Sequence, residues 1–283
     1  MNRFLKFAPI AFCACAVALV SCSDDDNNEP SLPDVPDVVK PVGPSADNVF
    51  TNGLPAMVDG AALTTNDKGQ VIKIEDDYQT TAFEYGSFSR AESFDAKMTV
   101  TYKNYDDEKI VYYLRLNEQG FITYALEEYT DSYGTETETY EFKYDAEGRM
   151  TYVCSSDNDE TFTMTYTDGN LTEVLEKETD GDYSTSTFIY TDSEVKAPYE
   201  NKGKIMMFDE WNVDLDNIAV AYYAGLLGKA VKNLPLGYTK FGKEGGDEYT
   251  DTYVFHWEFN TAGFPTKFWE GDDPYGVITF TWK

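Results

Sequence analysis

The chain has 283 residues, with 51 acidic and 22 basic side chains, one histidine and a formal net charge of −29. This charge excludes nucleic acid as a partner, because proteins bind phosphates with lysines and arginines that release counterions. It also argues against binding to anionic lipid headgroups and leaves cationic partners or divalent ions open. The length suits one large domain or two small ones, and we expect one.

Residues 1–21 have the features of a secretory signal peptide. Arg3 and Lys6 precede an apolar run from Phe7 to Val20, which is too short to stay in a membrane as a spanning helix. The run ends in Leu19-Val20-Ser21-Cys22, which resembles the lipobox of bacterial lipoproteins. The resemblance implies that Cys22 receives a diacylglycerol on sulfur and an acyl chain on its freed amine. The alternative is an ordinary secretory signal with an incidental cysteine.

Lipidation of Cys22 would attach the protein to the membrane through its acyl chains. Each buried methylene contributes about 0.8 kcal/mol, so two or three chains anchor stably without any inserted polypeptide. The acidic stretch Ser23-Asp24-Asp25-Asp26 resembles the export signal of Bacteroides-type surface lipoproteins. It implies an outer-membrane lipoprotein exposed at the cell surface. A solvated acidic tether on a protein that faces the periplasm is the alternative.

Residues 22–47 form an acidic, proline-rich tether. Five prolines and few large apolar residues favour an extended segment, which at about 3.1 Å per residue could reach roughly 75 Å. A tail without a tuned length explains the composition equally well. The prolines are Pro30, Pro33, Pro36, Pro41 and Pro44.

The cysteines exclude an intramolecular disulfide in the mature chain. Cys13 and Cys15 leave with the leader and Cys22 is acylated, so Cys154 is left alone. Cys154 ends a strand-like run, and we expect a buried, inert thiol.

Residues 48–283 are predicted to form a single antiparallel β domain. A turn pattern of Asn or Asp, two residues and Gly recurs before strand-like runs, and it shortens to Asp168-Gly169 in one copy. Asn and Asp start turns through side-chain bonds, and Gly supplies the positive φ that closes them. The segments are TNDKGQVIKI, LNEQGFITYA, YDAEGRMTYV, YTDGNLTEV and FNTAGFPTKF, with Gly69, Gly120, Gly148, Gly169 and Gly263.

The runs between these turns alternate apolar and polar residues. In one of them Met98, Val100 and Tyr102 face one way, and Thr99 and Thr101 the other. Similar runs begin at Tyr140, Phe162 and Tyr253. Period two with threonine and aromatic residues indicates strands buried on one face. A dozen or more such strands predict a mainly β fold, a many-stranded antiparallel meander that is curved or barrel-like.

One segment departs from this pattern. The sequence VDLDNIAVAYYAGLLGKAVKNLPLG predicts a buried helix near residues 216–232, with cap candidates before it and Pro235 after it. Ala224, Gly225 and Gly228 make this helix thin, so we expect it to pack into the concavity of the sheet.

YDAEGRMTYV resembles a YD repeat, the hairpin unit of Rhs-type shells. Together with the lipobox and the AYYAGLLGKAVKNLP segment, residues 49–283 resemble a Bacteroides-type lipoprotein family with a domain of unknown function and a porin-like β fold. The resemblance implies a many-stranded antiparallel sheet and carries over no catalytic residue. The acyl anchor, the apolar helix and the long tether favour a barrel-like domain in water over a transmembrane barrel.

The sequence has no pattern that assigns a catalytic or metal-binding site. His256 lies among alternating aromatic residues and fits a strand position on the polar face better than a triad or a zinc site. Calcium is an option that no motif supports, since the acidic groups lack the pattern of an EF-hand loop. The candidates are Asp157, Asp159 and Glu160; Asp180 and Asp182; and Asn212, Asp214 and Asp216. Turns and a helix cap explain most of them.

Sugar binding has one weak candidate in KFWEGDDPYG, where Trp269 and Tyr275 stand beside acidic residues. Core packing is the more common role of such aromatics. We therefore expect a non-enzymatic binding or scaffolding module with a glycan or protein ligand. The alternatives are a carboxylate-dependent glycan hydrolase and a structural component of the envelope.

Overall fold

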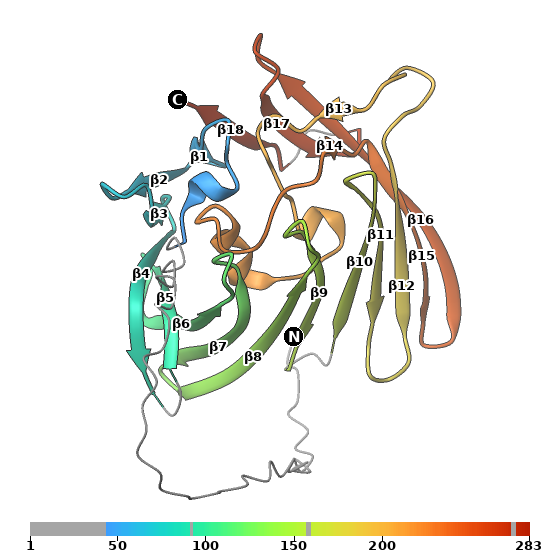
Figure 1. The fold of residues 1–283 in the computed structure, drawn as a ribbon. Coiled ribbons are helices and arrows are strands. Elements are labelled where there is room, and N and C mark those ends of the chain that lie inside the picture. Colours follow the sequence, from blue (N-terminus) through green and yellow to red (C-terminus); the bar gives the residue numbers. More distant parts are fainter. Residues whose placement is uncertain (1–43, 91–92, 157–159, 273–275) are drawn as a thin grey trace, which may run out of the picture. The chain divides into compact units, whose positions relative to one another are not determined.

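The computed structural model describes residues 44–90, 93–156, 160–272 and 276–283. Within them, sixteen strands form one closed antiparallel barrel, and β13 pairs with β14 in a separate small sheet (Figure 1). Cys22, Tyr275, Asp157 and Asp159 lie outside the described residues. The predicted mainly β, many-stranded antiparallel fold is confirmed. The strands are β1 Pro55–Val58, β2 Ala61–Thr65, β3 Val71–Glu75, β4 Gln79–Ser89, β5 Ser93–Tyr102, β6 Tyr105–Leu116, β7 Ile122–Asp131, β8 Gly134–Tyr144, β9 Met150–Ser155, β10 Thr161–Thr167, β11 Asn170–Lys177, β12 Tyr183–Ile189, β13 Tyr199–Glu200, β14 Asn233–Leu234, β15 Gly237–Glu244, β16 Asp247–Phe259, β17 Pro265–Glu270 and β18 Ile278–Trp282.

The barrel wall follows the predicted alternation. In β5, Met98 and Val100 are fully buried and face the interior, whereas Lys97, Thr99 and Thr101 face outward. β8 and β10 repeat the pattern with Phe142 and Phe162 inside. A barrel that spans a membrane has the opposite arrangement, with its apolar side chains turned to the lipid.

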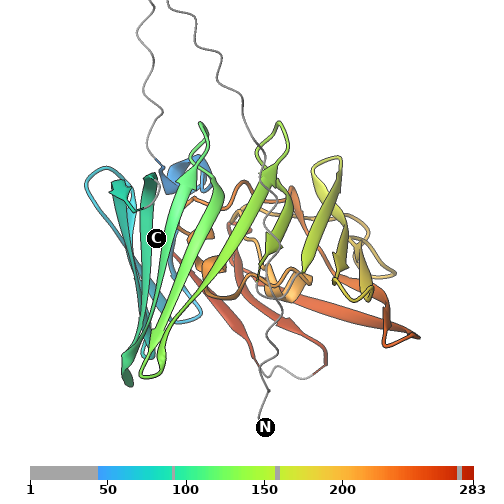
Figure 2. The same ribbon diagram turned by 90° about the horizontal axis from the view of Figure 1, so that it is seen from below.

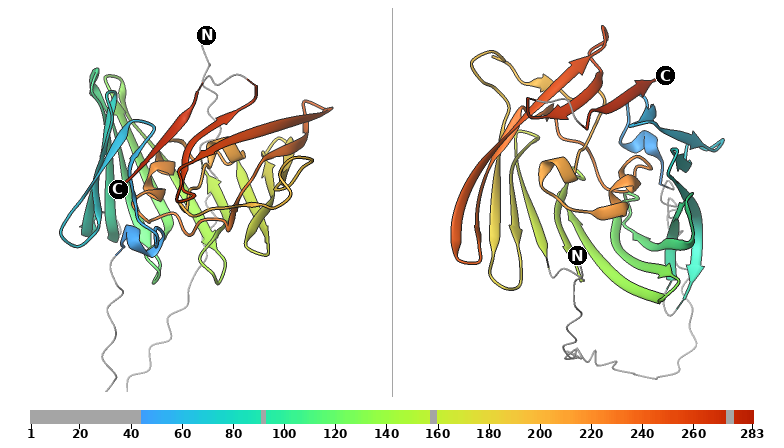
Figure 3. Two further views of the ribbon diagram at one scale, coloured as in Figure 1. Left: turned by 90° about the horizontal axis from the view of Figure 1, so that it is seen from above. Right: turned by 180° about the vertical axis from the view of Figure 1, so that it is seen from behind.

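The chain between β13 and β15 fills the interior of the barrel. This segment, residues 201–236, is called the plug, and it lies inside the ring of strands in Figure 3. Its side chains Trp211, Tyr222 and Leu226 are buried to 1 % exposure or less. Asn201 holds its start, because the side-chain Nδ2 donates to the Ile205 and Val231 carbonyls while Oδ1 accepts from the Ile205 N–H.

The predicted helix is shorter and of a different type in the structure. A 3₁₀ helix, η3, spans Asp216–Tyr222, and irregular chain follows it. Gly225 and Gly228 have φ of +78° and +85°, which an α-helix cannot contain. A Cβ on Gly225 would lie 2.7 Å from the Ser45 carbonyl oxygen. The small residue therefore leaves room for the chain at Ser45 and Ala46, which crosses the plug at this point. None of the helices in the described part of the chain has the length and apolar character that a membrane span requires.

The predicted Asn/Asp–Gly turns all lie at one end of the barrel, here called the glycine end. In the first, Asn66 Oδ1 accepts hydrogen bonds from the N–H groups of Lys68 and Gln70, and the Gly69 N–H donates to the Asn66 carbonyl. Asn117, Asp145 and Asn260 form turns of the same kind. The plug and the short helix η1, Ala46–Asn48, reach this end.

A tyrosine before each of several turns ties neighbouring hairpins together at the glycine end. The Tyr144 hydroxyl donates to the Ile122 carbonyl at 2.7 Å, and the Tyr166 hydroxyl donates to the Met150 carbonyl at 2.7 Å. Tyr190 makes the same bond to the Leu171 carbonyl. Each accepting residue lies just after the preceding turn, so these tyrosines form a repeated structural contact.

The opposite end of the barrel is called the tyrosine end. It carries the hairpin tips at residues 76–78, 103–104, 132–133, 178–182 and 245–246, because alternate connections of an antiparallel meander lie on the same side. Figure 2 shows the strands from the side, with η1 at the glycine end. The prediction that Cys154 is buried is wrong, because Cys154 is a free thiol on the outer wall and is only half-buried.

Candidate functional site: an acidic cavity inside the barrel

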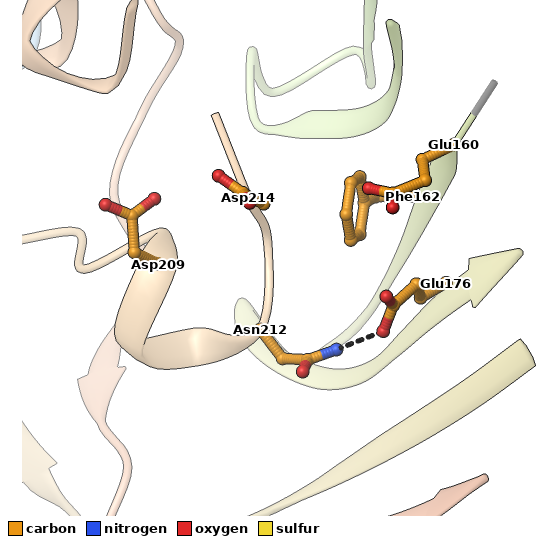
Figure 4. Close-up of a pocket in the computed structure, with 6 residues that line it drawn as sticks. All are labelled: Glu160, Phe162, Glu176, Asp209, Asn212 and Asp214. Atoms are coloured by element: carbon orange, nitrogen blue, oxygen red, sulfur yellow. Dashed lines mark hydrogen bonds between the residues drawn. The ribbon is translucent and has the colours of Figure 1, made fainter. Parts of the chain in front are cut away.

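A cavity of about 490 Å³ lies between the barrel wall and the plug (Figure 4). Glu160 precedes β10, Phe162 belongs to β10 and Glu176 belongs to β11. Phe162 pairs with Glu176, and Glu176 pairs with Ser184 of β12, so all three share the inner face of the wall. The plug supplies the other side of the cavity with Asp209, Asn212 and Asp214.

Glu176 is the most strongly bonded carboxylate in this cavity. Its Oε2 accepts hydrogen bonds from Ser184 Oγ at 2.6 Å, Asn212 Nδ2 at 3.1 Å and Lys240 Nζ at 3.2 Å. Burial by itself raises the pKa of Glu176, but the Ser184 hydrogen bond and the Lys240 charge outweigh it and lower the pKa overall. Lys240 also donates to Asn212 Oδ1 at 2.7 Å, which links the wall to the plug.

Two other carboxylates of the cavity have raised pKa values. Burial, then the charge of Glu210, raises the pKa of Asp209 from 3.8 to about 6. Burial, then the charges of Glu176 and Glu178, raises the pKa of Glu160. Their negative charges are therefore incompletely compensated by the protein, which favours a positively charged group in the cavity.

Asp209→Asn is expected to stabilise the protein at pH 7 and to leave its stability unchanged at pH 3.5. Between the unfolded pKa and the folded pKa of about 6, only the unfolded chain has lost this proton, so wild-type stability falls as the pH rises. By surface area Asp209 is exposed, and this contact with water limits the size of the effect. Urea unfolding at both pH values measures it.

Asp192→Asn is the matched control with the opposite sign. Hydrogen bonds from the backbone N–H groups of Val195 and Glu194 lower the pKa of Asp192, so its stabilisation is present at pH 7 and is lost in acid. If Asp209→Asn destabilises at pH 7 as Asp192→Asn does, the environment assigned to Asp209 is wrong.

Three glutamates at the rim of this cavity have metal-ligating geometry. One carboxylate oxygen from each of Glu160, Glu176 and Glu178 lies within 4.8 Å of the others. Such oxygens suit calcium. Among the calcium candidates from the sequence, Glu160, Asn212 and Asp214 line this one cavity. Asp182 instead accepts a hydrogen bond from the Gly245 N–H of the next hairpin. Glu176 was not among the predicted site residues, because its inward position follows only from strand register.

A second, apolar cavity of about 180 Å³ adjoins the acidic one, and Asp209 lines both. The remaining walls of the second cavity are largely apolar side chains of the plug, including Met206, Phe208 and Val220. Asp59 and Glu210 also line the second cavity.

Trp269, the sugar-binding candidate that the structure describes, does not line this cavity. Trp269 is half-buried in β17, where its ring stacks on His256 of β16 at a centroid distance of 5.1 Å. Both side chains lie on the outer wall, opposite in phase to the buried Phe255 and Phe268. His256 thus has the predicted position on the polar face. Tyr275 lies outside the described residues.

The closed antiparallel barrel of the described residues defines the class of the domain, a many-stranded β barrel. Comparison with protein families agrees: residues 63–267 match a domain of unknown function (DUF4595) with porin-like fold. The match covers most of the chain, so the chain belongs to this family, as predicted.

Two solved structures are similar to this chain. A porin-like protein from Bacteroides uniformis is 18 % identical, with a TM-score of 0.49 over 79 % of this chain and 89 % of that one. A porin-like protein from Bacteroides vulgatus is 12 % identical, with a TM-score of 0.45 over 81 % of this chain and 99 % of that one. Comparison with curated proteins finds no match.

Proposed function

We propose that the protein is a lipid-anchored component of the cell envelope and a non-enzymatic binding module for cationic groups. The anchor rests on the lipobox at Leu19–Cys22, and the outer-membrane surface location rests on the acidic stretch that follows it. The polar outer wall and the filled interior support a barrel that stands in water and is held to the membrane by acyl chains.

The acidic cavity carries the binding proposal. It is lined by the four carboxylates of Glu160, Glu176, Asp209 and Asp214. The Lys240 ammonium group donates a hydrogen bond to Glu176. The volume of about 490 Å³ far exceeds a single ion and fits an organic cation. The apolar cavity beside Asp209 accommodates an aliphatic stem.

Calorimetric titration of the full-length chain with n-butylammonium tests this proposal. We expect binding that weakens about tenfold or more in a Glu160→Gln, Asp214→Asn variant, which loses two charges from the cavity and leaves the Glu176 bonds intact. Glu141→Gln, on the exposed outer wall, is the control. Calcium binding without amine binding, or equal affinity in the cavity variant, contradicts the proposal.

Glycan hydrolysis is a second candidate, and the divergent pKa values of two acids favour it. Asp209, with its pKa raised to about 6, and an ionised Glu176 are the acid and base that such chemistry uses. Against it, Glu176 Oε2 already accepts three hydrogen bonds from the protein. Release of reducing ends that is abolished by both Asp209→Asn and Glu176→Gln would establish this candidate.

A further inference from the structure

The three most exposed large apolar side chains in the described residues are all tyrosines at the tyrosine end. Tyr78, Tyr105 and Tyr133 are 73 %, 58 % and 96 % exposed. They stand at the β3–β4, β5–β6 and β7–β8 connections, which follow one another around the barrel. Exposed aromatic residues gathered in this way mark an interaction surface.

The turns fix the backbone at two of these tyrosines. Asp76 Oδ1 accepts hydrogen bonds from the Tyr78 and Gln79 N–H groups, and Asp131 Oδ1 accepts them from the Tyr133 and Gly134 N–H groups. The first two hairpins also touch, because the Lys103 N–H donates to the Tyr78 carbonyl at 2.8 Å. The three tyrosines therefore stand in a row on successive hairpin tips at the tyrosine end.

The charge at this end of the barrel favours a basic partner. Exposed acidic side chains share the end, while Lys103 is already drawn to Glu75 at 3.2 Å. Tyrosine rings bind ammonium and guanidinium groups through their faces, and carboxylates strengthen that attraction. Asp77 and Glu136 belong to the hairpins of the row, whereas Glu178, Asp180, Glu244 and Asp247 belong to the β11–β12 and β15–β16 hairpins, where Lys177 is also exposed.

The spacing of the row suits an extended chain. Neighbouring strands lie about 4.8 Å apart, so tips two strands apart repeat about every 10 Å and three of them cover roughly 20 Å. An extended peptide spans this length with about six residues.

We propose that the tyrosine end docks a lysine- and arginine-rich segment of another protein, which lies across Tyr78, Tyr105 and Tyr133. Glu160 and Glu178 stand in the β9–β10 and β11–β12 connections, so the acidic cavity lies at the same end of the barrel. The inference rests on the proposed function, because one basic side chain of the segment enters this cavity. The neighbouring carboxylates bind the other basic side chains.

The test compares two peptides on the full-length chain at low salt. One is a twelve-residue peptide in which lysine and arginine alternate with serine, and the other has glutamine in place of each basic residue. We expect the basic peptide alone to bind, and the triple variant Tyr78→Ser, Tyr105→Ser, Tyr133→Ser to bind it about tenfold more weakly. Ile72→Ser with Val254→Ser, at exposed apolar positions in β3 and β16, is the matched control and is expected to match wild type.

Binding of n-butylammonium by the same variants separates the two proposals. The tyrosine variant should bind this amine as wild type does, because the cavity is untouched. Amine binding without peptide binding overturns the docking surface alone, as does a triple variant with wild-type peptide affinity. A wild-type chain that binds neither the amine nor the basic peptide overturns the proposed function. A further outcome is a wild-type chain that binds a mixed oligosaccharide pool and not the peptide, with the triple tyrosine variant binding neither. That result assigns the surface to glycans and overturns the inference.

Discussion

Gly225→Leu is expected to destabilise the protein by about 4 kcal/mol, which corresponds to a fall in Tm of roughly 10 °C. Two costs add at this position. The φ of +78° is unfavourable for any residue with a Cβ, and that Cβ would lie 2.7 Å from the Ser45 oxygen and 2.9 Å from the Ala46 Cα. Both contacts are to backbone, so the neighbouring chain cannot yield by a side-chain rotation. Ala224→Leu, at a fully buried position, should also lower the Tm sharply.

Gly60→Leu separates the two costs at Gly225. Gly60 has nearly the same φ, +79°, but no atom within 4 Å of its added Cβ. We expect it to cost only about 1–2 kcal/mol, the share that belongs to the backbone conformation. Thermal melts of both variants measure the difference. Equal losses would mean that the N-terminal segment does not press on the plug at Gly225.

Cys22→Ser is expected to move the protein from the membrane fraction to the soluble fraction. In our account the acyl chains on this residue are the whole attachment, because two or three chains hold a protein stably and a single chain holds it only marginally. Cell fractionation measures the change, and mass spectrometry of the wild-type chain should show the added lipid mass. Cys154→Ser, which removes the free thiol on the outer wall, is the control.

A Cys22→Ser protein that stays in the membrane would refute the anchor and reopen the question of direct insertion. A wild-type Cys22 with an unmodified thiol would have the same consequence.

Local features of the fold could be predicted from the sequence because they depend on neighbouring residues. Alternation placed Met98 and Val100 inside the barrel, and the Asn/Asp–Gly pattern located the turns. The length of the helix could not be predicted, because Gly225 and Gly228 take positive φ where Ser45 and Gly148 cross the plug. Those contacts join residues far apart in the sequence.

The candidate site could be predicted only in fragments. Glu160, Asn212 and Asp214 were noted as acidic or metal-like groups, but their common cavity depends on where the plug lies inside the barrel. Glu176 carries no local signal, because its inward position follows from its pairing with Phe162 and Ser184. The exposed tyrosines have a local signal that can be recognised afterwards, since Tyr78 and Tyr133 each stand two residues after an aspartate in a turn.

The most direct test of the account is a crystal structure of the protein soaked with n-propylguanidinium, which matches the end of an arginine side chain. The account predicts the guanidinium inside the barrel, against the carboxylates of Glu160, Glu176 and Asp214, with its propyl group toward the cavity lined by Met206 and Val220. An empty cavity at saturating ligand, or a guanidinium bound only on the outer wall, would contradict it.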